Sequence, residues 1–171
     1  MPAIAEQSRL ISRDTALQDA LSRYDANLAT FRDLSAKLRK PNRAALFDTL
    51  AATRISLVIV TIGHDDDGGR LENLAVIAAD PSMRLPQDPI TLSLPLWGLP
   101  EPLDLELSIP HAIERMAFDC LEESFGSYPS DFAGSDTLIF DVVSRAVAIT
   151  KPASARSRKK AGASASRGAQ E

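Results

Sequence analysis

The run of three aspartates that begins at Asp65 is the densest group of chemistry-bearing side chains in the sequence. Their carboxylates are the kind of ligand that calcium and magnesium prefer. An EF-hand loop, however, needs a glycine at its sixth position and a glutamate at its twelfth, and here these positions hold Arg70 and Val76. The EF-hand is therefore excluded. A looser cation site that also uses Asp67 and Glu72 stays open beside the simpler interpretation, a solvated hairpin turn.

The other reactive side chains do not form a recognisable catalytic set. His64 and His111 are the only histidines, and they lack the close spacing of paired zinc ligands. Cys120 falls on the apolar face of an expected helix, where a thiol packs rather than reacts. The acidic side chains beside it could do acid–base chemistry, but a solvated helix face explains them as well; they are Asp119, Glu122 and Glu123.

The sequence also lacks the nucleophile elbow, the phosphate-binding loop and the dinucleotide-binding fingerprint. The absence of these motifs favours a protein that is not an enzyme. It does not exclude an enzyme, because many active sites have no local sequence signature. We therefore predict no catalytic residue and no cofactor, and we favour a non-enzymatic protein.

The composition is that of an ordinary globular protein. The chain has 171 residues, of which 44% are hydrophobic, enough for one domain with tails. No apolar run approaches the roughly 18 residues of a membrane span, and no secretory signal is visible. The single Cys120 excludes an internal disulfide and fits a reducing compartment. These features predict a cytoplasmic protein without membrane contact.

The charge is divided unevenly along the chain. Residues 1–150 hold 13 Lys and Arg against 22 Asp and Glu, whereas residues 151–171 hold six Lys and Arg against Glu171 alone. The last segment has no Leu, Ile, Val or Phe, so we expect a disordered basic tail. Such a tail either solubilises the protein or makes weak, salt-sensitive contact with nucleic acid; the candidate residues are Arg156, Arg158, Lys159 and Lys160.

A helix is expected over residues 14–40, after a flexible N-terminus over residues 1–13. Its apolar residues alternate at spacings of four and three, the heptad pattern that also builds coiled coils. Pro41 predicts the end of this helix. The stripe either packs on its own domain or binds an unknown partner or a second copy of the chain; its predicted interaction residues are Leu21, Leu28 and Phe31.

Residues 42–150 predict an α+β domain. Asn42 is a suitable cap for a second, short helix over residues 43–53. Two β-branched runs around the acidic turn predict a hairpin, and a second hairpin is expected over residues 138–150. Between them, Ser108 caps a helix that ends at Gly126. We therefore expect a mostly antiparallel sheet of two hairpins covered by helices.

A proline-rich segment, residues 79–102, separates the first hairpin from that helix. Proline disfavours a long helix or a central strand, so the alternating run Ile90–Leu94 is expected to be a short edge strand. Trp97, the only tryptophan, lies in an apolar loop of this segment. The loop is either a lid on the core or an exposed docking patch, which makes Trp97 a further candidate interaction residue.

Three stretches together resemble a known family. They are residues 45–52 running into the first strand, the Asp- and Gly-rich turn leading to residues 71–74, and residues 113–123 followed by residues 138–142. The pattern resembles the domain-of-unknown-function 6878 family over about residues 42–150. The resemblance implies a small bacterial protein, often encoded near plasmid and phage genes, and it brings no known activity or catalytic residues.

These observations lead to one main hypothesis and two alternatives. The main hypothesis is an uncharacterised cytoplasmic accessory protein, of a mobile-element or accessory-genome setting, that binds another macromolecule without catalysis. The first alternative is a protein that associates weakly with nucleic acid through its basic tail. The second is a divalent-cation-dependent enzyme or sensor that uses the acidic turn.

Overall fold

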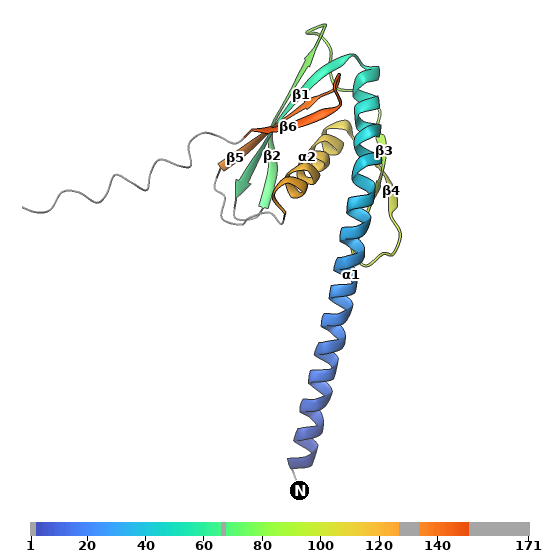
Figure 1. Cartoon of the computed structure of the whole chain (residues 1–171), viewed down its shortest axis with the longest axis vertical. Coiled ribbons are helices and arrows are strands. Elements are labelled where there is room, and N and C mark those ends of the chain that lie inside the picture. Colours follow the sequence, from blue (N-terminus) through green and yellow to red (C-terminus); the bar gives the residue numbers. More distant parts are fainter. Residues whose placement is uncertain (1–2, 66–67, 127–133, 151–171) are drawn as a thin grey trace, which may run out of the picture. The chain divides into compact units, whose positions relative to one another are not determined.

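The computed structural model describes residues 3–65, 68–126 and 134–150 (Figure 1). It confirms an α+β protein with antiparallel sheets. The elements in chain order are α1 (Ala3–Ala52), β1 (Ile55–Asp65), β2 (Gly68–Ala78), β3 (Ile90–Leu94), β4 (Leu103–Leu107), α2 (Ile109–Phe125), β5 (Gly134–Asp141) and β6 (Ala146–Thr150).

The chain forms two compact units. The first, here called the helix–hairpin unit, comprises Met1–Leu50 and Leu85–Met116. The second, here called the sheet unit, comprises Ala51–Arg84 and Ala117–Glu171. Helix α2 contributes its first half to the helix–hairpin unit and its second half to the sheet unit.

Helix α1 is one continuous helix of 50 residues, and Pro41 lies inside it. The prediction that the helix ends at Pro41 and that a second helix follows is therefore wrong. Proline removes one backbone donor and crowds the preceding turn, which is a local penalty only. The segment after Pro41 buries Leu46, Phe47 and Leu50, each at most 2% exposed, and this burial favours continuation of the helix.

Replacing Pro41 with alanine should stabilise the protein by about 1–3 kcal/mol, because it restores a helical hydrogen bond and relieves the crowding. Urea unfolding measures the change. Pro89→Ala is the matched control, since Pro89 is exposed and lies outside every helix and strand, and it should leave the stability nearly unchanged. An unchanged or lower stability for Pro41→Ala would contradict this account of the helix.

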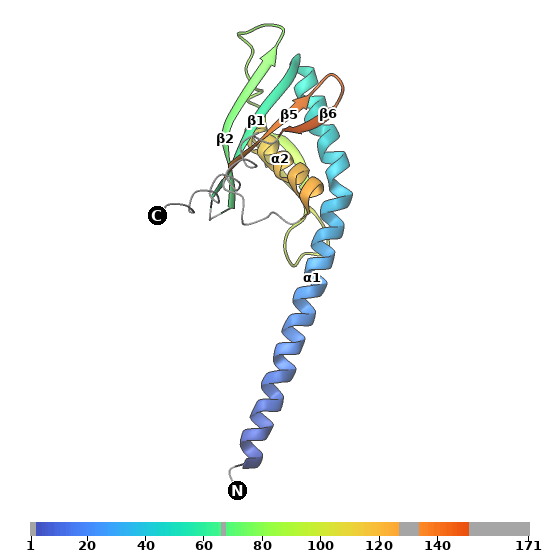
Figure 2. The same cartoon turned by 60° about the vertical axis from the view of Figure 1, so that its left-hand side comes forward.

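The sheet unit contains a four-stranded antiparallel sheet in the order β2–β1–β5–β6 (Figure 2). Both predicted hairpins are present, and the central contact between them joins β1 to β5. One face of the two central strands is fully buried, as expected for alternating residues in a pleated strand. Its members are Val58, Val60 and Ile62 on β1 and Leu138 and Phe140 on β5.

The first hairpin is tighter than expected. The strands that flank the acidic turn pair up to Asp65 and Gly68, so most of the expected turn belongs to the strand pairing. The register shifts between Thr61 and Ile62, because Glu72 is an extra residue on β2, a β-bulge. The side chain of Glu72 lies over Gly63, where a Cβ atom would overlap it. The Glu72 side chain is exposed, so it covers Gly63 from the solvent side of the strand pair.

Helix α2 contacts the sheet through Phe118. A Cβ atom built on Gly69 would come within 2.6 Å of the Phe118 ring, so the aromatic side chain occupies the space that a larger residue at position 69 would need. The methyl group of Ile62, a fully buried residue of β1, lies close to the same point. Gly69 thus permits close packing of α2 on the β1–β2 hairpin.

Gly69→Ala should destabilise the protein by about 1–3 kcal/mol, because the added methyl group meets a packed ring. Phe118→Leu in the same chain should recover part of the loss, and a double-mutant cycle in urea measures the coupling. Gly63→Ala is the control, since the exposed Glu72 chain that it meets is free to rotate. Equal losses at both glycines would contradict the packing described for Phe118.

The β5–β6 hairpin closes through Asp141 and Arg145. The Asp141 carboxylate accepts hydrogen bonds from the backbone N–H groups of Val143 and Ser144, each at 3.0 Å. The bond from the Ser144 backbone is the main cause that lowers the pKa of Asp141 below its ordinary value. Arg145 has a φ of 56°, in the left-handed region that completes such turns. The turn confirms the predicted second hairpin.

In the helix–hairpin unit, β3 and β4 form a separate two-stranded sheet. Ile90–Leu94 is a strand, as predicted, but it is not an edge of the main sheet: it pairs only with β4. Helix α2 begins as predicted, with the Ser108 carbonyl accepting from the Ala112 N–H at 2.9 Å. It ends at Gly126, whose φ of 76° suits a helix terminus.

Candidate interaction surface

The loop between β3 and β4 presents Trp97 at the corner of a tight turn. The Leu99 N–H donates to the Leu96 carbonyl at 3.1 Å, and the third residue of this turn, Gly98, has a φ of 81°. A positive φ at that position is the requirement of a type II turn, which glycine meets without strain. Trp97 therefore occupies a fixed corner of the backbone, so its indole side chain is presented in a defined direction.

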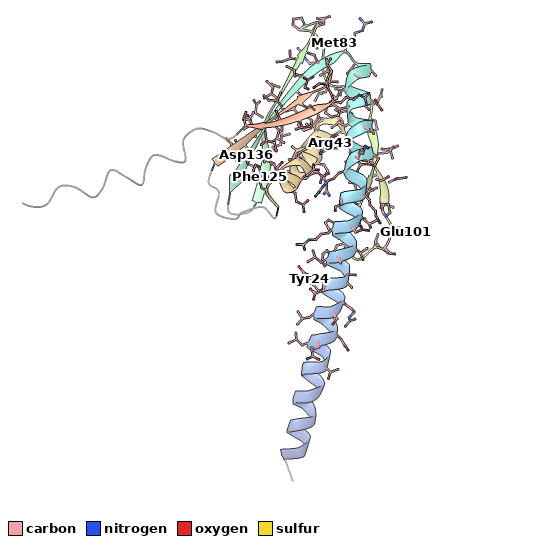
Figure 3. All side chains as sticks on the ribbon, viewed as in Figure 1. Tyr24, Arg43, Met83, Glu101, Phe125 and Asp136 are labelled. Carbon is pink, nitrogen blue, oxygen red and sulfur yellow. The ribbon has the colours of Figure 1, made fainter. Side chains whose placement is uncertain are left out.

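The indole ring contacts the aromatic residues of the α1 stripe. Its centroid lies 5.1 Å from the Tyr24 ring at an interplanar angle of 46°, and 6.1 Å from the Phe31 ring at 49°. These distances and tilts are typical of favourable aromatic pairs. Figure 3 shows Tyr24 on the stretch of α1 that the β3–β4 loop, marked by Glu101, approaches. The stripe on α1 and the Trp97 loop, predicted separately, lie together.

These residues belong to an exposed apolar surface on the helix–hairpin unit, here called the helix–tryptophan surface. Tyr24 and Trp97 remain 53% and 48% exposed although their rings touch. A soluble protein rarely leaves so many large apolar side chains in contact with water. The seven members of the surface, each at least 36% exposed, are Leu17, Leu21, Tyr24, Leu96, Trp97, Leu99 and Leu103.

The predicted interaction residues divide into two groups. Leu21 is 55% exposed and Trp97 is nearly as open, so both are available to a partner. Leu28 and Phe31 are half-buried. Ser35, the polar residue of the stripe, is buried and donates its hydroxyl to the Phe31 carbonyl at 2.8 Å, which satisfies it within the helix. The open part of the stripe therefore lies toward its N-terminal end.

The β3–β4 hairpin is fixed to α1 by the side chain of Asn42. Its amide nitrogen donates to the Ser93 carbonyl at 2.8 Å, and its amide oxygen accepts from the Ser93 N–H at 3.2 Å. Asn42 was predicted to cap a second helix. Instead it lies within α1, 7% exposed, and pairs with a strand as another strand would. Sequence reasoning missed this contact because its partners are 51 residues apart.

Asn42→Ala should destabilise the protein by about 1–3 kcal/mol, because it leaves two part-buried backbone groups of Ser93 without their partner. Hydrogen exchange at the Ser93 amide should accelerate at the same time. Ser93→Ala is the matched control: it removes only the exposed 2.5 Å hydrogen bond from the Ser93 hydroxyl to Asp104 and keeps the backbone groups. Unchanged exchange in Asn42→Ala would contradict the role assigned to this amide.

The predicted cation site is not assembled by the side chains that the structure describes. Asp67 lies outside the described residues, as does the side chain of Asp65. Glu72 is exposed on β2 and lies over Gly63. Among the described residues, no three His, Cys, Asp or Glu side chains come together as metal ligands. The cation site therefore remains an untested prediction.

The remaining candidate chemistry is local to α2. The His111 Nδ1 atom lies 2.9 Å from the Ser108 hydroxyl, and both residues are exposed, so the pair belongs to the first turn of the helix. Cys120 is buried and forms no disulfide, as the sequence indicates. Glu122 and Glu123 are exposed, whereas Asp119 is only 9% exposed. The basic residues Arg156, Arg158, Lys159 and Lys160 lie outside the described residues.

The sheet unit has a second, smaller apolar face. The strand residues that alternate with the buried ones form a cross-strand row of Ala75, Ile59, Ile139 and Ala148, in register across all four strands. Ile77 on the same face is 45% exposed. The row is flanked by threonines and carries no aromatic side chain, so it is less suited than the helix–tryptophan surface to anchor a partner.

Comparison with known proteins bears on the central and C-terminal parts of the chain. One family model, described as a family of unknown function (DUF6878), matches residues 38–156, more than half of the sequence. The chain belongs to this family. The resemblance drawn from the sequence is thereby confirmed, and the family's description assigns no function. No curated protein and no solved structure matches the chain.

The DUF6878 match divides the helix–tryptophan surface. Trp97 and its neighbours in the β3–β4 loop lie inside the matched residues, whereas Leu17, Leu21 and Tyr24 precede them. None of the described helices is long and apolar enough to cross a bilayer.

Proposed function

We propose that this DUF6878 protein is a non-catalytic binding protein that holds another macromolecule on its helix–tryptophan surface. The observation that carries the proposal is the contact between Tyr24 and Trp97, which joins two half-exposed apolar stretches into one surface. Large aromatic side chains with aliphatic neighbours are the usual anchors of protein interfaces. The rigid turn at Gly98 and the two-bond contact at Asn42 hold these anchors in place before a partner arrives.

The proposal includes a cellular setting. The family resemblance implies a bacterial accessory protein encoded near mobile elements, and the presence of a single cysteine fits the reducing cytoplasm. Neither feature identifies the partner. Both favour a protein that acts by binding other components of the same compartment.

A second candidate is nucleic-acid binding through the basic tail. Its support is the charge division of the sequence, with six Lys and Arg in residues 151–171 against one acidic residue. The acidic remainder of the chain would repel a phosphate backbone, so this contact would be weak and sensitive to salt. The two candidates use different parts of the chain, and one experiment separates them.

Leu17→Gln combined with Leu21→Gln should reduce partner capture from a host lysate by about tenfold or more, because two apolar contacts are lost while helix-forming residues are kept. Quantitative pull-down with tagged protein measures it. Val143→Gln is the matched control, since Val143 is 83% exposed in the sheet unit and away from the surface in sequence; its capture should be unchanged.

The same pull-down is repeated with nuclease and with residues 151–171 removed. Capture that survives both treatments and is lost in the double glutamine variant supports binding on the helix–tryptophan surface. The alternative result is capture that is lost on nuclease treatment or tail removal and is unchanged in the double glutamine variant. That result supports the nucleic-acid candidate and contradicts the main proposal.

A further inference from the structure

We propose that the partner on the helix–tryptophan surface is a second copy of this chain, with the two α1 helices antiparallel. This inference rests on the proposed function, because it names the occupant of the same surface. It predicts an isologous dimer in which Leu17, Leu21 and Tyr24 of each copy cover those of the other.

The spacing of the apolar residues on α1 is that of a helix pair. Leu17 and Tyr24 occupy one of the two seam positions of a heptad, and Leu21 and Leu28 occupy the other. α1 is continuous through all four residues, so they lie along one side of the helix. Heptad spacing favours another helix as the occupant, because the seam residues of one helix fit between those of a second.

The polar pairs of α1 lie on the opposite side. Lys37 and Asp33 form an ion pair at 2.7 Å with both side chains more than 60% exposed, and the Arg23 Nε atom donates to the Asp19 carbonyl at 3.2 Å. In the heptad, these four residues fall at two of the three positions farthest from the seam. The helix is thus charged away from the seam and apolar along it, as expected for a helix that pairs along one face.

The residues flanking the seam favour two identical antiparallel helices. Gln18 and Asp25 lie on one flank, and Ala20 and Asn27 lie on the other. In an antiparallel pair, residues of the same flank face each other, so the amide of Gln18 meets the carboxylate of Asp25 twice, once from each copy. In a parallel pair, Asp25 would face Ala20 and gain no partner. The antiparallel arrangement also keeps the two Trp97 loops from meeting at the same level of the helix pair.

The exposed area is of the size that a dimer requires. Seven side chains that are 36–59% exposed offer on the order of 600 Å² per copy, taking large side chains as about 150–250 Å² each. A standard interface buries roughly 800 Å² per partner. The three members that the second copy covers, Leu17, Leu21 and Tyr24, are the most exposed of the seven, and the flanking residues of α1 enlarge the contact.

The first test is the oligomeric state of the full chain, measured by sedimentation over a wide range of concentration. We expect a species of twice the 18.4 kDa chain mass for the natural protein and for the Val143→Gln control. The Leu17→Gln, Leu21→Gln variant should be monomeric with unchanged circular dichroism. A monomeric natural protein, or a dimer that the glutamines do not affect, would overturn the inference.

The second test fixes the orientation by cross-linking. In a Cys120→Ala background, which removes the only natural thiol, a Gln18→Cys chain is mixed with a larger, tagged Asp25→Cys chain and treated with the shortest bismaleimide. The antiparallel pair predicts a cross-linked product of one natural-size and one tagged chain. Preferential cross-linking of Ala20→Cys with Asp25→Cys would show a parallel pair and overturn the inference.

The outcomes also separate this inference from the proposed function. If the natural protein is a monomer, yet captures another macromolecule that the double glutamine variant loses, the proposed function stands and the second copy is excluded as its partner. If neither a dimer nor glutamine-sensitive capture is found, both are wrong.

Discussion

The two hydrogen bonds between Asn42 and the backbone of Ser93 are the constraint on which the rest of the helix–hairpin unit depends. A two-stranded hairpin is marginal on its own in water. Here the Asn42 amide satisfies one N–H and one C=O of β3 as a neighbouring strand would. That contact fixes the hairpin beside α1, and the position of Trp97 against Tyr24 and Phe31 follows from it.

The continuity of α1 through Pro41 is equally necessary for this contact between the helix and the hairpin. Asn42 follows Pro41 directly, so a helix that ended at the proline would turn the amide away from the strand. The helix also carries the apolar stripe as far as Leu17 and Leu21, on the N-terminal side of Tyr24 and Phe31, whose rings contact Trp97. The same element therefore contributes the fixed point of the unit and the exposed surface, which explains why apolar side chains stay open to water on a well-packed protein.

The sequence predicts those features that depend on local chemistry. The apolar runs identify the two hairpins of the main sheet and the strand Ile90–Leu94, and Ser108 and Gly126 mark the ends of α2. The features that the sequence did not predict depend on contacts between residues far apart in the chain. The stop signal at Pro41 is outweighed by burial of residues further along the helix, and Asn42 pairs with a residue 51 positions away. The contact of Trp97 with Tyr24 and Phe31 is non-local in the same way, because it joins the β3–β4 loop to residues of α1 more than 60 positions earlier.

The family match does not extend to the whole proposed interface. Residues 38–156 include Asn42, Ser93 and Trp97, the parts that fix and present the indole ring. They exclude Leu17 and Leu21, the most exposed leucines of the surface. The matched residues therefore contain the hairpin and its tryptophan but not the N-terminal part of the helical stripe. The proposed pairing of α1 helices, by contrast, is an argument about this chain, because the side chains that decide it precede the matched region.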